Sequence, residues 1–307
     1  MYPDSLRAHF LIAGVQKGGT TALADYLRQH PALFMPAAKE LHFFDDESLN
    51  WQQPQDHYGS YHAQFSDAPA GSLWGEATPI YSYWWPAMAR IWAYNPEMRL
   101  ILCLRNPVER AYSHWAMETG RSWDTLPFPE AITSEAERCR AALPQQHRVF
   151  SYTSRGFYSE QLRRLWSFFP REQTLILRQE ELLEDPGDTL SRVHRFLGVD
   201  PLIPAQTLKA NRGNYANPMD PALRNHLQQL FNPEITQLEQ LLNWDLSQWR
   251  GEIPAVHSTN HPAQRLGMLQ GQCSVPDDFD RIQTEELADS FEGQNQPTTR
   301  SPSGPPI

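Results

Sequence analysis

The feature that most constrains this chain is the stretch FLIAGVQKGGTTALADYLRQHP, residues 10–31. An apolar, β-rich run leads into a glycine-bearing turn and then into apolar residues at helical spacing, which predicts a strand, a loop and a helix. Proteins hold phosphate in this arrangement, because the first N–H groups of a helix lack partners within it. The spacing of Gly14 and Gly19 nearly matches the P-loop of nucleoside triphosphatases, but Thr20 stands where that motif has lysine. The loop's only lysine is Lys17, so we expect a phosphate-bearing ligand that is met by a lysine inside the loop.

Three further apolar runs predict strands, and amphipathic patterns between and after them predict helices. The runs lie within residues 72–79, 98–107 and 173–186. Alternating strands and helices are typical of an α/β fold with a P-loop-like parallel sheet flanked by helices on both faces. Ligands of such sheets bind at the carboxyl ends of the strands, so we expect one shared crevice if these strands are neighbours. The loops concerned follow Gly14, Gly75 and Leu104.

The chain reads as one domain followed by a tail. Helices are predicted near residues 221–231 and 233–243, and after about residue 250 the composition turns to Pro, Gln, Ser, Thr and acidic residues. Such a composition buries little apolar surface. We therefore expect a domain over residues 1–250, an extension packed on or beside it over 251–284, and a disordered tail over 285–307.

Charge and cysteine content restrict the partners and the compartment. The formal net charge of -10 argues against a nucleic-acid-binding surface, which needs clustered Lys and Arg. Three cysteines cannot all pair, and Cys103 lies in an apolar run that suits a reduced core thiol. No signal-peptide pattern precedes Phe10, and no apolar run approaches the roughly 18 residues of a membrane span. We expect a cytoplasmic protein without membrane insertion, and the sequence carries no signal for an oligomeric state.

Two segments carry candidate phosphate-binding groups. In the first loop, backbone N–H groups near the helix start can point at an anion, and Lys17 adds a full charge; these N–H groups belong to Gly18, Gly19, Thr20 and Thr21. The alternative is a plain glycine-rich turn with a solvated lysine. In LRNPVERAYSHW, Arg105 at a strand end can direct two N–H donors at a phosphate, and Ser113 can add a hydroxyl. The alternative is a local ion pair between Arg105 and Glu109.

The block KELHFFDD, residues 39–46, is a candidate for general-base chemistry. Lys39, Glu40, His42 and Asp45 surround two phenylalanines, and a carboxylate held against aromatic surface has a raised proton affinity. Glu40 is then the base, with His42 orienting it or binding the acceptor. The alternative is a solvated charged loop over a core-facing aromatic pair. A metal site is the weaker interpretation, because the block has no recognisable ligand spacing.

Several blocks in this order resemble the PAPS-dependent sulfotransferases, particularly the branch of the heparan sulfate sulfotransferases and their bacterial relatives. PAPS is 3'-phosphoadenosine-5'-phosphosulfate. The blocks are GVQKGGTTAL, KELHFFD, GEATPIY and LRNPVERAYSHW, followed by LILRQEELLEDPGDTLSRVHRFLGV and FNPEITQLEQLLNWDLSQW, so the resemblance covers about residues 8–249.

The resemblance implies a role for each candidate group. The first loop binds the 5'-phosphosulfate of PAPS through Lys17, Gly18, Gly19, Thr20 and Thr21, and Arg105 and Ser113 bind the 3'-phosphate. Glu40 takes the proton of the acceptor hydroxyl, with His42 as a further catalytic residue and Lys17 stabilising the departing phosphate oxygen. Sulfuryl transfer is in line, needs no metal, and releases 3'-phosphoadenosine-5'-phosphate (PAP). Acceptor contacts are expected from Asp45, Lys39, Tyr81 and Trp84, and further donor contacts from Arg212 and Gly213 in LKANRGNYANP.

Two positions depart from the heparan sulfate enzymes. Ala77 stands where their block has a lysine after the glutamate, and Thr21 stands where some relatives have arginine. The acceptor is therefore left open between a glycan, a small molecule and a carrier-bound intermediate. Alternatives to a sulfotransferase are a P-loop small-molecule kinase, which needs a lysine after Gly19, and a non-catalytic nucleotide-binding protein.

Overall fold

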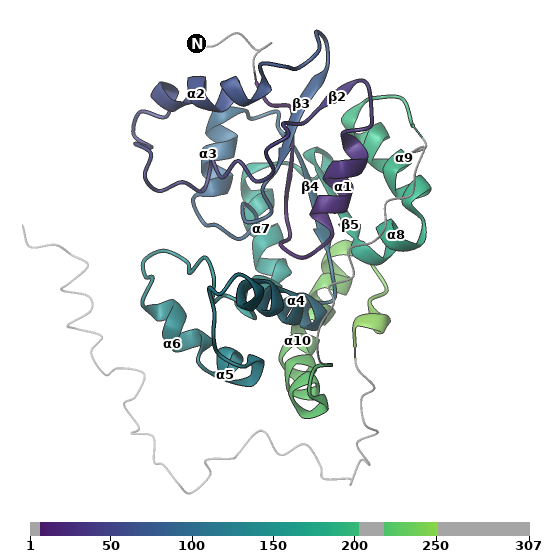
Figure 1. Ribbon diagram of the computed structural model, residues 1–307. Helices are drawn as coiled ribbons and strands as arrows, with labels where there is room; N and C mark the ends of the chain where they lie inside the picture. The colour runs from purple at the N-terminus through teal and green to yellow at the C-terminus, as the bar shows by residue number, and fades with distance from the viewer. Residues whose placement is uncertain (1–6, 203–217, 251–307) are drawn as a thin grey trace, which may run out of the picture. The chain divides into compact units, whose positions relative to one another are not determined.

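A five-stranded parallel sheet forms the centre of the protein, in the order β2-β3-β1-β4-β5 (Figure 1). The computed structural model describes residues 7–202 and 218–250. The predicted extension and tail, 251–284 and 285–307, lie outside the described residues. The strands are β1 (Phe10–Gly14), β2 (Leu33–Phe34), β3 (Leu73–Ala77), β4 (Arg99–Leu104) and β5 (Thr174–Arg178).

Helices cover both faces of the sheet, as the alternating pattern predicts (Figure 1). They are α1 (Thr20–Leu27), α2 (Gln55–His62), α3 (Ala87–Tyr94), α4 (Pro107–Gly120), α5 (Phe128–Thr133), α6 (Glu135–Arg140), α7 (Tyr158–Phe168), α8 (Gln179–Glu184), α9 (Pro186–Leu197) and α10 (Pro221–Leu242). Successive residues of β1 serve the two faces in turn: Phe10 and Ile12 pack with α1 and α9, whereas Leu11 and Ala13 pack with α3 and α7. No described helix is both long and apolar enough to cross a membrane.

Local signals fix several helix ends. Asn106 caps α4 by accepting from the N–H of Val108 at 3.0 Å, and Pro107 occupies the first turn. Asp185 caps α9 in the same way, accepting from Asp188 at 3.0 Å. Gly198 ends that helix with a φ of 75°, in the left-handed region that favours glycine.

The prediction of two helices after residue 220 is wrong, because α10 runs unbroken from Pro221 to Leu242 with Pro233 inside it. Pro233 removes one backbone hydrogen bond, but tertiary packing holds the helix together. Phe231 and Ile235 are fully buried, and Glu234 accepts from the N–H of Ser159 at 2.6 Å. The packed face therefore outweighs the local break.

The strand order brings three loops together. β1 lies between β3 and β4, and the pairs Phe10–Gly75 and Phe10–Arg99 set the register. β3 continues past Gly75 to Ala77, and β4 ends at Leu104, one residue before Arg105. The carboxyl ends of the three neighbouring strands thus lie at one edge of the sheet, where α/β sheets bind their ligands.

Candidate active site

The loop between β1 and α1 needs glycine at position 18, where its backbone passes closest to β4. A Cβ atom on Gly18 would lie 2.0 Å from the carbonyl oxygen of Cys103. Lys17 and Gly19, with φ of 70° and 97°, turn the backbone into α1. Among the described residues no side chain caps this helix end, so its first N–H groups are open to an anion.

The predicted backbone donors of the loop are not all equivalent. The N–H of Gly18 donates to the carbonyl oxygen of Val15 at 2.9 Å, so it is used within the loop. Gly19, Thr20 and Thr21 stand at the cap and first turn of α1, where N–H groups have no acceptor within the helix. These three groups remain as candidate donors to a ligand.

Positive charge gathers around the loop. Burial lowers the pKa of Lys17, and the nearby charges of Arg105, Arg121 and Lys39 lower it further, whereas Glu118 opposes the shift. Cations that repel one another in a partly buried site are stabilised when an anion binds between them. The uncapped helix end and these cations together fit a phosphate- or sulfate-bearing group.

Arg105 lies beside this loop rather than in a local ion pair. Its Nη1 donates to the carbonyl oxygen of Lys17 at 3.3 Å, and its own carbonyl oxygen accepts from Tyr158 at 2.8 Å. Glu109 pairs with Arg224 instead of Arg105. The guanidinium is therefore free of a carboxylate partner in the described part of the chain, as a phosphate-binding arginine should be. Ser113 lies on α4 and is buried.

The candidate base lies at the end of the neighbouring strand. The N–H of Glu40 donates to the carbonyl oxygen of Ala77 at 3.1 Å, which ties residues 39–46 to the end of β3. Glu40 itself has a φ of 62°. Its carboxylate contacts the ammonium of Lys39, and its Oε2 lies 3.5 Å from Nε2 of His42. The raised proton affinity expected for Glu40 from the sequence is wrong: burial raises its pKa, but the hydrogen bonds from His42 and Lys39 outweigh burial and lower it to about 2.

His42 lies between two carboxylates. Its Nδ1 is 3.0 Å from Oδ2 of Asp45, and this hydrogen bond, with that to Glu40, raises the pKa of His42 to about 9. Asp45 is fully buried and also binds Arg148, through both its carboxylate and its carbonyl oxygen. Burial raises the pKa of Asp45, but the bonds from His42 and Arg148 lower it below its usual value. At neutral pH the site holds an ionised Glu40 beside a charged imidazole.

Two of the predicted acceptor residues are core residues in the structure. Tyr81 is 0% and Trp84 2% exposed, and the Tyr81 hydroxyl accepts from the N–H of Phe43 at 3.1 Å. Neither ring therefore presents a face on which an acceptor could stack. Trp85, the next residue, is 61% exposed. The predicted donor contacts Arg212 and Gly213 lie outside the described residues.

The sequence interpretation missed two arginines that adjoin the site. Arg148 binds Asp45, and Arg155 donates to the side chain of Gln16, which precedes Lys17. Both arise from the segment before α7, far along the chain from the residues that they contact. The only sequence signal for Arg155 is weak: it is followed by a glycine shortly before an amphipathic helix. The structure needs that glycine, because a Cβ on Gly156 would lie 2.6 Å from the ring of Phe231.

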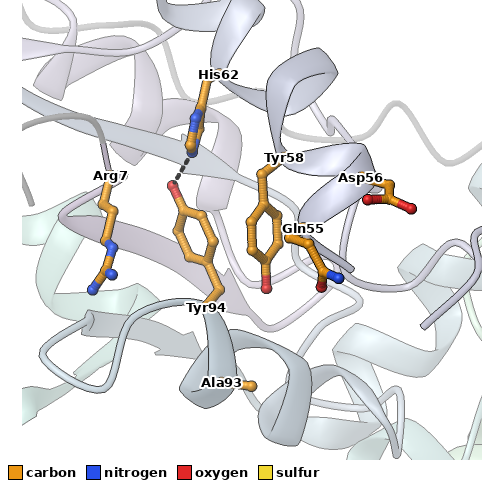
Figure 2. A pocket seen from close by; sticks show the side chains of 7 residues that line it. All are labelled: Arg7, Gln55, Asp56, Tyr58, His62, Ala93 and Tyr94. Carbon is orange, nitrogen blue, oxygen red and sulfur yellow. Dashed lines mark hydrogen bonds between the residues drawn. The ribbon is translucent and has the colours of Figure 1, made fainter. Parts of the chain in front are cut away.

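A separate cavity lies away from these residues. It has a volume of about 400 Å³ and is lined by Arg7, Gln55, Asp56, Tyr58, His62, Ala93 and Tyr94 (Figure 2). Arg7 precedes β1, so the cavity is at the opposite end of that strand from the Lys17 loop. Within residues 7–202 and 218–250, no three His, Cys, Asp or Glu side chains are placed to hold a metal ion.

Comparison with known proteins links this geometry to one family. Residues 7–218 match the family model of the sulfotransferase domain. The chain is 32% identical over 192 residues to human (Homo sapiens) heparan sulfate glucosamine 3-O-sulfotransferase 6, covering 62% of this chain and 52% of that protein. It is 33% identical over 196 residues to the human 3-O-sulfotransferase 3B1, covering 63% and 46%. The chain thus spans about half the length of these curated relatives.

A solved structure shares the fold as well as the sequence pattern. The crystal structure of a sulfotransferase from Alicyclobacillus acidocaldarius has a TM-score of 0.69 and 30% identity, covering 80% of this chain and 99% of that one. The family model accounts for more than half of the chain. The chain belongs to the sulfotransferase domain family.

Proposed function

We propose that this protein is a PAPS-dependent sulfotransferase that modifies a hydroxyl group of its acceptor. The observation that carries the proposal is the placement of two groups at the carboxyl ends of adjacent strands. Lys17 follows β1 in an uncapped phosphate-type loop, and Glu40 is bonded at 3.1 Å to the last residue of β3. A cation for a leaving group and a carboxylate for an incoming hydroxyl are the two parts that sulfuryl transfer needs.

The chain's own residues divide into a donor side and an acceptor side. On the donor side, the helix-start N–H groups and Lys17 hold the 5' end, while Arg105 and Ser113 hold the 3'-phosphate. PAPS supplies the sulfuryl group, which passes from a bridging phosphate oxygen to the acceptor oxygen. Lys17 stabilises the negative charge left on the phosphate oxygen, because its ammonium already lies in a partly buried, cation-rich loop.

On the acceptor side, Glu40 takes the hydroxyl proton as the acceptor oxygen attacks. With a pKa of about 2 it is a weak base while His42 and Lys39 both bind it. An acceptor hydroxyl that replaces Lys39 at the carboxylate removes one of these stabilising bonds and raises the proton affinity of Glu40. His42 keeps the carboxylate in place through its Nε2, with its other nitrogen held by Asp45.

The acceptor is a sugar, a small metabolite or a carrier-bound intermediate. The similar human enzymes are named for heparan sulfate, and Ala77, buried at the end of β3, stands where the resemblance of GEATPIY to the heparan sulfate enzymes implies a lysine. An acceptor as strongly anionic as heparan sulfate would lose a cationic contact at this position. We therefore favour an acceptor with less negative charge beside the reacting hydroxyl.

The test is transfer of ³⁵S from labelled PAPS to heparan sulfate, to 4-nitrophenol and to water, for wild type, Glu40→Gln and Glu47→Gln. Glu47 is a matched control, because it lies in the same loop but binds Arg90 and Trp84. We expect Glu40→Gln to lower the transfer rate about 10²–10⁴-fold while PAP still binds, and Glu47→Gln to stay near wild type.

Three outcomes would contradict parts of the proposal. Normal transfer by Glu40→Gln would remove Glu40 as the base. Tighter binding of ADP with magnesium than of PAP, with ATP turnover, would favour a small-molecule kinase. Tight PAP binding by a wild type that transfers to no acceptor in a broad panel of sugars, small-molecule hydroxyls and carrier-bound intermediates would favour a non-catalytic nucleotide-binding protein.

A further inference from the structure

The segment from Arg148 to Arg155 joins the two loops of the candidate active site. Arg148 binds the carboxylate and the carbonyl oxygen of Asp45, in the loop of the proposed base. Arg155 binds the side-chain oxygen of Gln16, in the donor loop. Arg155 also donates to the carbonyl oxygen of Arg148 at 2.6 Å and to Ser151 at 2.7 Å, so it holds its own segment in shape.

Arg155 serves as a fixed link rather than a ligand contact. It is 2% exposed, and its Nε, Nη1 and Nη2 each donate to another group of the protein. Its guanidinium also lies 4.8 Å from the ring centroid of Tyr83. A ligand would have to break one of these bonds in a buried place, which is costly for a charged group.

At the other end, Arg148 restrains the residue that orients His42. Asp45 is fully buried, and its carboxylate is shared between Arg148 and Nδ1 of His42, 3.0 Å away. A buried carboxylate that loses one partner rotates or takes up water to satisfy its free oxygen. Because the Nε2 of His42 lies 3.5 Å from Glu40, any turn of the imidazole moves the neighbour of the base.

We propose that Arg148 is a positioning residue, which acts through Asp45 and His42 to fix the orientation of Glu40, while Arg155 ties the same segment to the donor loop at Gln16. This rests on the proposed function, because it gives Glu40 its task as the base. A segment outside both loops then sets the spacing between the proton-accepting carboxylate and the leaving-group lysine. Such spacing matters, since a misplacement of about 1 Å can cost about 10²-fold in rate.

Arg90 is a control arginine that contacts the same loop and is the more buried of the two, with its side chain 12% exposed against 42% for Arg148. Arg90 donates to the carbonyl oxygen of Phe44 at 3.0 Å, pairs with Glu47 at 2.8 Å, and lies 4.2 Å from the ring centroid of Trp51. Arg148 makes the same three kinds of contact, two of them with Asp45 in the same loop and the third with the ring of Trp84, in the segment after β3, at 4.3 Å from the centroid. Only Arg148 binds the carboxylate that holds His42, so a purely structural role would make the loss of Arg90 at least as harmful as the loss of Arg148.

The experiment compares Arg148→Gln, Arg148→Lys and Arg90→Gln, with ³⁵S-labelled PAPS as the donor. The acceptor is the one of heparan sulfate, 4-nitrophenol and water to which wild type transfers fastest. We expect Arg148→Gln to lower kcat about 10–100-fold with the KM for PAPS within about twofold of wild type. The lysine variant keeps the charge but loses the second donor, so it should recover part of kcat. Arg90→Gln should keep kcat within about threefold.

A double-mutant cycle separates positioning from general loosening of the loop. If Arg148 acts only through Asp45, the variant Asp45→Asn combined with Arg148→Gln should be no slower than Asp45→Asn alone. The same cycle with Arg90→Gln should be additive. Thermal unfolding and PAP binding of each variant show that the compared proteins are folded.

Equal falls in kcat for Arg148→Gln and Arg90→Gln, or an additive cycle for Arg148 and Asp45, would overturn the positioning role while leaving the sulfotransferase function intact. An unchanged kcat in Arg148→Gln would do the same. A wild type that binds PAP but transfers to no acceptor in a broad panel of sugars, small-molecule hydroxyls and carrier-bound intermediates would instead remove the proposed function, and the positioning role with it. The two failures are thus distinguishable from the wild-type rate alone.

Discussion

The guanidinium of Arg105 donates to the carbonyl oxygen of Lys17 at 3.3 Å, so the loop after β4 is joined directly to the loop after β1. This contact holds the arginine beside the lysine loop without using a carboxylate. Within residues 7–202 and 218–250 no carboxylate pairs with this guanidinium, which fits the proposal that it binds a second anionic group. A nucleotide that carries phosphate on both its 3' and 5' positions has two such groups, whereas ADP has only the 5' chain.

The first prediction concerns nucleotide selectivity. Arg105→Ala should weaken binding of PAP about 10–100-fold, because a hydrogen bond to a charged group contributes about 1.5–3 kcal/mol. Binding of ADP should change little. Calorimetric titration of wild type, Arg105→Ala and Arg224→Ala measures this. Arg224 in α10 is the control, because it pairs with Glu109 in α4. Equal weakening of both nucleotides by Arg105→Ala would show that this arginine does not read the 3'-phosphate.

The second prediction concerns the acid limb of the rate profile. Burial raises the pKa of Glu40, and the bonds from His42 and Lys39 together lower it to about 2. Lys39→Met removes one bond and one charge, so the pKa of Glu40 should move up toward its ordinary value of 4.5. As the pH is lowered from 8 toward 4, kcat/KM of wild type should not fall at the acid end, because Glu40 stays ionised. The kcat/KM of Lys39→Met should fall there, because part of its Glu40 becomes protonated. Superimposable profiles would show that Lys39 does not control the ionisation of Glu40.

The third prediction separates two glycines by the space around them. Gly18→Ala places a Cβ 2.0 Å from a backbone oxygen and should lower the free energy of unfolding by about 2–3 kcal/mol. Gly59→Ala, in the exposed helix α2, meets nothing within 4 Å and should raise it by about 0.5–1 kcal/mol, because alanine favours helix. Urea unfolding of both variants checks the signs. A neutral Gly18→Ala would mean that the loop relaxes easily around an added methyl group.

The sequence predicts those parts of the fold that are encoded in contiguous residues. The apolar run at β1 indicates a strand buried on both faces, and Gly198 marks the end of α9 through its left-handed backbone. β2 has only two residues, Leu33 and Phe34, and forms by pairing with β3. It is too short to be predicted from a periodic pattern of apolar residues. Pro233 misleads in the other direction, since its local preference is overridden by the buried face of α10.

The candidate site divides in the same way. The positions of Lys17 and Arg105 beside each other follow from the sequence, because each comes shortly after a strand and parallel strands bring such segments together, whereas the bond that ties Glu40 to the end of β3 does not. Arg148 is not predictable either, because its contact with Asp45 spans 103 positions of sequence and depends on how the segment before α7 folds back. Trp84 shows the opposite error. Sequence alone does not distinguish aromatic residues that line a binding site from those that fill the core. In the structure Trp84 is buried, and its indole N–H donates to Glu47 at 2.7 Å.

The last prediction concerns Glu76, a buried carboxyl group in β3 that the proposed chemistry does not use. It is 1% exposed, and its Oε2 accepts from Thr78 at 2.7 Å. Burial raises the pKa of Glu76 from 4.5 to about 7, with Asp45 adding repulsion and Thr78, Tyr81 and His42 opposing the shift. Because the folded state holds the proton more tightly than the unfolded state does, this group's contribution to stability is complete below pH 4.5 and is lost as the pH rises through 7.

Glu76→Gln has no such titration, so its stability relative to wild type should rise between pH 5 and pH 8, by about 3 kcal/mol at most. His42 also loses its contribution to stability as the pH rises through about 9, but it does so in both proteins and cancels in the difference. Urea midpoints at each pH, with Glu97→Gln as an exposed control, give the measurement. Parallel curves for wild type and Glu76→Gln would mean that Glu76 is ionised in the fold at neutral pH and that its charge is satisfied within the core.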